Sequence, residues 1–204
     1  MSLLLEMFTY PFILRAFVVG ILISLCAALL GVPLVLKRYS MIGDGLSHVS
    51  FGALSVALAC GWAPLPVSIP VGVSAAVLVL YVLFYHRLFA ITFDESFSRA
   101  TGMRVGLYNT VLSVLTALTI VLGMRLMGAM LISSLVIFPA LTAMRLLRSF
   151  RGVVICAGVL SVVCFCAGLT GSYLLSTPVG ATVVLADLAA FLLACGAAGL
   201  KKRA

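Results

Sequence analysis

The sequence predicts an all-α membrane protein, a bundle of about seven transmembrane helices with one short amphipathic helix on the cytoplasmic side. Of its 204 residues 64% are hydrophobic and only 9% are charged, and the mean hydropathy is +1.33. A soluble globule of this composition would expose far too much apolar surface. A bilayer accepts long apolar runs, because each run satisfies its own backbone hydrogen bonds as a helix. The runs also reach the length of about 20 residues that a membrane helix needs.

Proline, glycine and charged residues divide the chain into these spans. The connections "GWAPLP", "RLFAITFDESFSRATGMR", "RLLRSFRG" and "STPVG" all carry such residues, where helices are expected to stop. Residues 124–126 leave almost no connection between two spans, so a broken or re-entrant helix is an alternative there. We expect one membrane domain over residues 1–204, with spans at residues 12–36, 43–61, 66–85, 106–124, 126–144, 152–175 and 180–200.

The net charge of +8 could suggest a nucleic-acid binder, but the basic residues form no stripe or patch. They flank the apolar runs instead, which is typical of the charges that orient a protein in the membrane. We therefore expect the C-terminus and the basic connections on the cytoplasmic side, the N-terminus outside, and no nucleic-acid partner. The basic groups are Lys37 and Arg38; Arg145, Arg148 and Arg151; and Lys201, Lys202 and Arg203.

Asp44 and His48, in "RYSMIGDGLSHVSFGAL", place two ionisable groups in an apolar stretch. An i, i+4 spacing puts both side chains on one helical face, about 6 Å apart in rise. A carboxylate with an imidazole suits a borderline divalent ion such as zinc, manganese or ferrous iron. A local hydrogen bond between the two side chains explains the spacing equally well. Spacing alone leaves both alternatives open.

The segment "RLFAITFDESFSRATGMRVG" breaks the apolar pattern with charged residues while it keeps phenylalanine at every fourth position. It predicts an amphipathic cytoplasmic helix that ends at Gly102. Such a helix either lies on the membrane surface or docks into a groove of a partner protein. The charged residues are Asp94, Glu95, Arg99 and Arg104, and the aromatic ones are Phe89, Phe93 and Phe97.

Polar residues also interrupt two later spans. In "MGAMLISSLVIFPALTAMR", Ser133, Ser134 and Pro139 stand in an apolar run, and Pro139 is expected to break or kink the helix. Asp187 follows Pro178 by roughly 13 Å of helix rise, which places it near mid-membrane. Its carboxyl group either faces a polar path or bonds a neighbouring serine or threonine.

Four segments in this order resemble the membrane permease subunits of ABC importers for zinc, manganese or iron. They are "KRYSMIGDGLSHVSFGAL", "LFAITFDESFSRATGM", "MGAMLISSLVIFPALTAMR" and "TPVGATVVL", and the resemblance covers most of the chain. It implies a multi-pass protein of the cytoplasmic membrane that passes the metal ion as cargo and binds no cofactor. The partners it implies are a second permease chain, an ATPase subunit and an extracytoplasmic metal-binding protein.

The resemblance also assigns roles to residues. It implies that Asp44 and His48 line the translocation path and contact the metal ion. It implies that residues 93–102 form the coupling helix, which seats in a cleft of the ATPase, where ATP is hydrolysed. The coupling residues are Phe93, Asp94, Glu95, Phe97, Arg99 and Gly102, and the further pathway candidates are Ser133, Ser134, Pro139 and Asp187.

The chain departs from the family pattern in one place. Between "YVLFYH" and "RLFAITFDESF" the family normally carries about two more spans, which are absent here, with the seam near His86. A shortened chain that keeps ATPase docking without transport is therefore an alternative function. A permease for a metal chelate such as a siderophore is another, although a large organic ligand needs an aromatic-lined cavity and the chain has one Trp.

Overall fold

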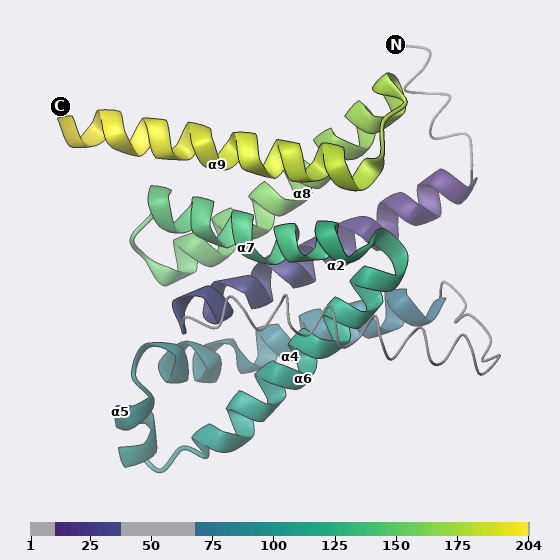
Figure 1. Cartoon of the computed structure of the whole chain (residues 1–204). Coiled ribbons are helices and arrows are strands. Elements are labelled where there is room, and N and C mark those ends of the chain that lie inside the picture. The colour runs from purple at the N-terminus through teal and green to yellow at the C-terminus, as the bar shows by residue number, and fades with distance from the viewer. Residues whose placement is uncertain (1–10, 38–67, 204) are drawn as a thin grey trace.

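The computed structural model describes residues 11–37 and 68–203, which form helices and short connections (Figure 1). No strand occurs in these ranges, which confirms the all-α class. Every helix in them except α5 is long and apolar enough to cross a membrane, which gives six candidate spans. The helices are α2 (Pro11–Leu36), α4 (Ser68–Phe93), α5 (Glu95–Ala100), α6 (Val105–Met127), α7 (Ala129–Leu146), α8 (Phe150–Leu175) and α9 (Val179–Arg203).

The observed helices match the predicted spans closely, with two corrections. The helix predicted at residues 66–85 continues to Phe93, so the seam near His86 falls inside one unbroken helix, α4. The alternative of a broken or re-entrant helix at residues 124–126 is wrong, because α6 is continuous through Met127. The chain turns at Gly128, whose φ of 93° is a conformation that other residues rarely adopt. The span predicted at 43–61 lies outside the described residues.

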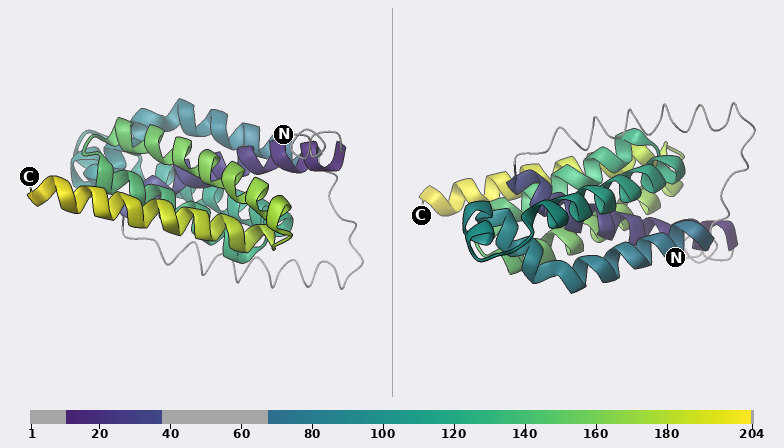
Figure 2. Two further views of the ribbon diagram at one scale, coloured as in Figure 1. Left: turned by 90° about the horizontal axis from the view of Figure 1, so that it is seen from above. Right: turned by 90° about the horizontal axis from the view of Figure 1, so that it is seen from below.

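Helix α2 occupies the middle of the bundle. It packs against α7 and α8 on one side and against α4 and α6 on the other, and α9 covers α7 and α8 from outside (Figures 1 and 2). Its side chains Ile23, Ala27, Ala28 and Val32 have no exposed surface. By contrast, α4 and α9 expose large apolar side chains such as Leu83 and Leu193, as expected of helices that face lipid.

The helices alternate in direction, so the connections fall at two ends of the bundle (Figure 1). The end of α2, helix α5, the α7–α8 connection and the C-terminus share one end, on the left of Figure 1. The α6–α7 and α8–α9 turns lie at the other. The basic connections thus share an end with α5, as alternation predicts. Which side of the membrane this end faces stays a prediction.

Pro139 does not break its helix. Helix α7 runs without interruption from Ala129 to Leu146 with Pro139 inside it, and the proline is buried. Proline has no N–H, so the carbonyl group one turn earlier, on Leu135, lacks its usual partner within the helix. Membrane helices tolerate such a loss where neighbouring helices surround the site. Of the predicted break or kink, the break is therefore wrong, because α7 is continuous through Pro139; the kink stays a prediction.

Close contact between α2 and α7 depends on Gly31. A Cβ atom at this position would lie 2.0 Å from the carbonyl oxygen of Val136, so the two backbones touch where no side chain fits. Small residues allow membrane helices to approach in this way. The contact lies between the two hydrophobic clusters of the bundle, in both of which α2 takes part.

We predict that Gly31→Ala separates α2 from α7 and destabilises the detergent-solubilised chain by about 1–3 kcal/mol, the usual cost of overpacking. The matched control is Gly171→Ala in α8, because a Cβ there meets nothing within 4 Å. Thermal unfolding followed by size-exclusion chromatography measures both variants. Equal stability of the two would contradict the close contact.

Candidate functional site

The predicted metal ligands Asp44 and His48 lie outside the described residues, so the structure assigns them no geometry. The described chain before them ends at Lys37, directly after α2. In the described ranges, no group of three or more His, Cys, Asp or Glu side chains could hold a metal ion. The candidate site is therefore described from the other predicted site residues and their described neighbours: α5, the end of α2, and the polar groups of α7 and α9.

Helix α5 is a separate helix of six residues, Glu95–Ala100, between α4 and α6. It starts at Asp94, whose carboxylate accepts a hydrogen bond from the Phe97 backbone N–H at 2.8 Å. This is a typical N-cap, which satisfies one of the free N–H groups of the first turn. The helix ends at Thr101, and Gly102 follows with a φ of 79°, which confirms the predicted stop.

One expectation about this segment is wrong. Phe89, Phe93 and Phe97 do not form one face of a single helix, because Asp94 is extended (φ −143°, ψ 95°) and separates α4 from α5. Phe89 and Phe93 belong to α4, and their ring centroids lie 4.8 and 5.6 Å from that of Phe150 in α8. Phe97 alone belongs to α5, and 66% of it is exposed.

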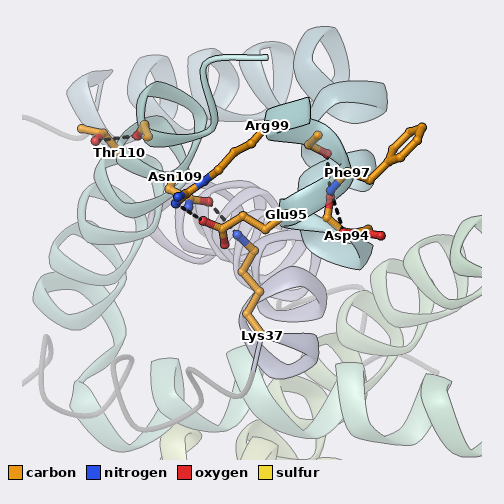
Figure 3. A network of polar contacts seen from close by, with 9 residues as sticks. Lys37, Asp94, Glu95, Phe97, Arg99, Asn109 and Thr110 are labelled. Atoms are coloured by element: carbon orange, nitrogen blue, oxygen red, sulfur yellow. Dashed lines mark hydrogen bonds and ion pairs between the residues drawn. The ribbon is translucent and has the colours of Figure 1, made fainter. Parts of the chain in front are cut away.

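A polar network joins α5 to the ends of α2 and α6 (Figure 3). The Lys37 amine donates a hydrogen bond to the Asn109 side-chain oxygen at 2.6 Å. Glu95, at the start of α5, points toward the Lys37 amine and accepts a hydrogen bond from Arg99 at 2.8 Å. Burial lowers the pKa of Lys37, and the nearby Glu95 carboxylate acts in the opposite direction. The network thus places opposite charges at the junction of three helices.

Sequence reasoning missed this network. Lys37 has the position expected of a charge that orients the protein in the membrane, and Asn109 is one polar residue at the start of an apolar run. The two lie 72 residues apart in the chain, so nothing in their spacing connects them. The available signal was Asn109 itself, because an amide group in a membrane span needs a hydrogen-bond partner.

A second polar group lies inside the bundle, between α7 and α9. Ser134 donates a hydrogen bond to one carboxyl oxygen of Asp187 at 2.9 Å, and Asp187 is only 2% exposed. The other carboxyl oxygen is buried and has no hydrogen-bond partner among the described residues. Of the two alternatives for Asp187, the bond to a neighbouring serine is therefore present. The pathway role of Asp187 and of Ser133, Ser134 and Pro139 stays a prediction.

Comparison with known families accounts for this combination of spans and motifs. The ABC 3 transport family matches residues 9–82 and 69–198, nearly the whole chain. The chain belongs to the ABC 3 transport family. It is therefore a multi-pass membrane protein of a transport family, as the sequence motifs predicted.

Several relatives carry printed names. A "Probable metal transport system membrane protein" of Treponema pallidum is 26% identical, over 92% of this chain and 96% of its own length. The "Manganese import system permease protein ScaB" of Streptococcus pneumoniae is 31% identical, over 76% of this chain and 54% of its own length. The "High-affinity zinc uptake system membrane protein ZnuB" of Haemophilus influenzae is 33% identical, over 57% of this chain and 45% of its own.

The solved structure "PsaBC from Streptococcus pneumoniae in complex with Fab" has the same fold. One of its chains superposes with a TM-score of 0.87 at 20% identity, over 95% of this chain and 94% of its own length. At this level of identity the likeness establishes the helical arrangement. The described helices of this chain thus have the same arrangement as those of the solved chain.

The comparisons also bear on the predicted absence of about two spans. The alignment with the Treponema protein runs over 254 positions, which exceeds the 204 residues of this chain. It must therefore contain positions that this chain lacks. The two segments matched by the family overlap at residues 69–82, in the first half of α4. The overlap lies within α4, and the seam near His86 stays a prediction.

We predict that Ser134→Ala destabilises the chain by about 1–3 kcal/mol, because it leaves the buried Asp187 carboxyl group without its hydrogen bond. Ser133→Ala is the matched control: the same substitution one residue earlier, at a half-buried position with no described bond to Asp187. Thermal unfolding in detergent distinguishes the two. A larger loss for Ser133→Ala would contradict the role of the Ser134–Asp187 bond.

Proposed function

We propose that this chain is the permease subunit of an ABC importer that passes a divalent transition metal ion, zinc, manganese or iron, into the cytoplasm. The observation that carries the proposal is membership of the ABC 3 transport family over nearly the whole chain. The relatives named for manganese import and zinc uptake support the metal as cargo. Asp and His ligands bind zinc, manganese and iron alike, so they do not identify which metal is carried.

In this proposal Asp44 and His48 are transient ligands on the translocation path. An aspartate and a histidine one helical turn apart can converge on one ion, and two protein ligands bind weakly enough to release it. An intramembrane charge is costly, at least about 2.5 kcal/mol on insertion scales, which favours a functional reason for the pair. The support here is the motif and the family, because the segment lies outside the described residues.

Helix α5, with Phe93, Asp94 and Gly102 beside it, is the proposed contact with the ATPase subunit. Phe97 supports this role, because it is 66% exposed at the tip of a connection between two membrane helices. An exposed aromatic side chain on a short capped helix suits insertion into a groove of a partner. ATP hydrolysis belongs to that partner, and movement of α5 would transmit it.

The proposed assembly contains two copies of this chain, two ATPase subunits and an extracytoplasmic metal-binding protein. Its location is the cytoplasmic membrane, with the α5 end of the bundle and the C-terminus on the cytoplasmic side. Basic residues gather in the connections at this end, including Arg145, Arg148 and Arg151, as the positive-inside rule expects.

A second candidate function is a shortened subunit that binds the ATPase without transporting metal. The overlap of the two family matches at residues 69–82 favours it, because the absent segment builds part of the pathway wall in the proteins that the sequence resembles. Reconstitution into liposomes with the ATPase subunit of the proposed complex distinguishes the two candidate functions. ATP-driven metal flux supports the importer, whereas ATPase binding without flux supports the second candidate.

We predict that Asp44→Ala and His48→Ala each abolish metal uptake, because each removes one of two ligands to the ion. Uptake of radioactive zinc or manganese by cells that express the complete complex measures this. Co-purification of the ATPase with each variant is the control for assembly. Normal uptake by both variants would contradict the ligand assignment.

We predict that Phe97→Ala weakens ATPase binding at least about tenfold, because it removes an exposed aromatic anchor. Leu147→Ala is the matched control, since Leu147 is also an exposed apolar residue in a connection at the same end of the bundle. Co-purification of the ATPase at increasing salt measures both. Equal retention of the ATPase by the two variants would argue against α5 as the contact.

A further inference from the structure

We infer that Lys37 and Asn109 are positioning residues that connect movement of α5 to the end of α2, and through it to the segment that carries Asp44 and His48. The inference rests on the proposed function. It gives a coupling role to two residues that had none: Lys37, which begins the first motif, and Asn109, which lies in no motif. The observation that carries it is a half-buried charge-assisted hydrogen bond at the junction of three elements (Figure 3).

The bond connects α6, which follows the candidate motor contact α5, to the end of α2, the last described helix before the candidate ligands in the chain. Lys37 directly follows α2, and its backbone N–H still bonds the Pro33 carbonyl group, so its main chain moves with that helix. Asn109 lies one turn into α6, and α6 follows α5 after the short connection through Arg104. Displacement of α5 and the start of α6 would therefore pull on the end of α2 through the Lys37–Asn109 bond.

The bond is of a strong type. A lysine amine is positively charged, and hydrogen bonds from an ionised donor are shorter and about twice as strong as neutral ones. The 2.6 Å separation fits this. Lys37 and Asn109 are both half-buried, so water competes for the bond less than at the surface. Glu95 adds a second attraction, because its carboxylate points toward the same amine from the first residue of α5.

A charge that only orients the protein in the membrane would not need the contacts that Lys37 makes with α6 and α5. A lysine that only orients the protein needs to sit in the headgroup region, where it stays solvated. Arg104 and Arg148, at the same end of the bundle, are exposed in this way. Lys37 instead gives up part of its hydration, and burial lowers its pKa. Specific partners on α6 and α5 offset that loss, which points to a role in joining the three helices.

The contact also adds a charged bond to the packing of α2 on α6, close to α5. Helix α5 is only six residues long and packs on α4 and, more lightly, on α6. Helix α2 contacts four long helices and anchors the bundle. A short peripheral helix can shift without disturbing such an anchor unless a specific bond connects them. The network of Lys37, Asn109 and Glu95 provides that connection.

The test uses the complete complex in liposomes, with the ATPase and the metal-binding protein, and compares metal uptake per ATP hydrolysed. We expect Lys37→Met, which keeps the apolar stem and removes the charge, to retain the ATPase and its basal hydrolysis. We expect it to lose about fivefold or more of the uptake per ATP, the lower range of typical coupling between sites. Asn109→Leu should show the same loss, and the double variant should lose no more than either single one.

Two further variants separate positioning from structure. Asn109→Asp keeps an oxygen acceptor for Lys37 and should retain most of the coupling. Thr110→Ala is the matched control, because the Thr110 hydroxyl group bonds only the Gly106 carbonyl of its own helix, at 3.0 Å, in the described contacts. It should behave as wild type.

The outcomes distinguish failure of the positioning role from failure of the importer function. Uptake per ATP within twofold of wild type in Lys37→Met, or loss of its ATPase during purification, overturns the positioning role while the importer stands. Equal losses in Thr110→Ala and Asn109→Leu overturn it as well. No ATP-driven uptake in the wild-type complex contradicts the importer, and the positioning role falls with it.

Discussion

The packing of α2 against four other helices is the constraint on which the rest of the structure depends. In a bilayer, lipid tails are as apolar as leucine, so helices associate through close van der Waals contact and a few hydrogen bonds rather than through exclusion of water. Gly31 allows a close contact with α7, because a Cβ there would clash with the Val136 carbonyl group. Ser161 of α8 adds a hydrogen bond to the Ser24 carbonyl group at 2.9 Å. Helix α2 thus holds α7 and α8 on one side and α4 and α6 on the other.

The polar groups of the bundle divide into two kinds by their depth. Asp187 is fully inside, where Ser134 on the neighbouring helix is its partner, and the pair joins α7 to α9. Lys37, Asn109 and Glu95 lie at one end of the bundle, where the ends of α2 and α6 meet the short helix α5. The first kind holds fixed helices together. The second kind lies beside α5, the proposed contact with the ATPase.

Much of the fold could be predicted from the sequence, because each apolar run ends in proline, glycine or charge. The described spans begin and end within a few residues of their predicted limits, with α4 as the exception. There the fourfold spacing of phenylalanine suggested one amphipathic helix, but the Asp94 side chain caps a new one. The Lys37–Asn109 contact could not be predicted, because a charge that orients the chain and one that bonds a distant amide look alike in sequence. The motif of Asp44 and His48 remains a prediction, because the described residues do not include it.

The absence of about two spans, which the resemblance implies, is compatible with the arrangement of α5 for a topological reason. The resemblance implies that about two spans are absent, and removal of a pair returns the chain to the same side of the membrane, whereas removal of one would reverse every later helix. The two matched segments of the family overlap at residues 69–82, and α4 is one continuous helix through the place where the absent spans are expected. This helix still ends at the Asp94 cap, at the same end of the bundle as Lys37. The contacts among α2, α5 and α6 are therefore compatible with the loss, and any deficit in transport would arise in the pathway wall rather than at the proposed motor contact.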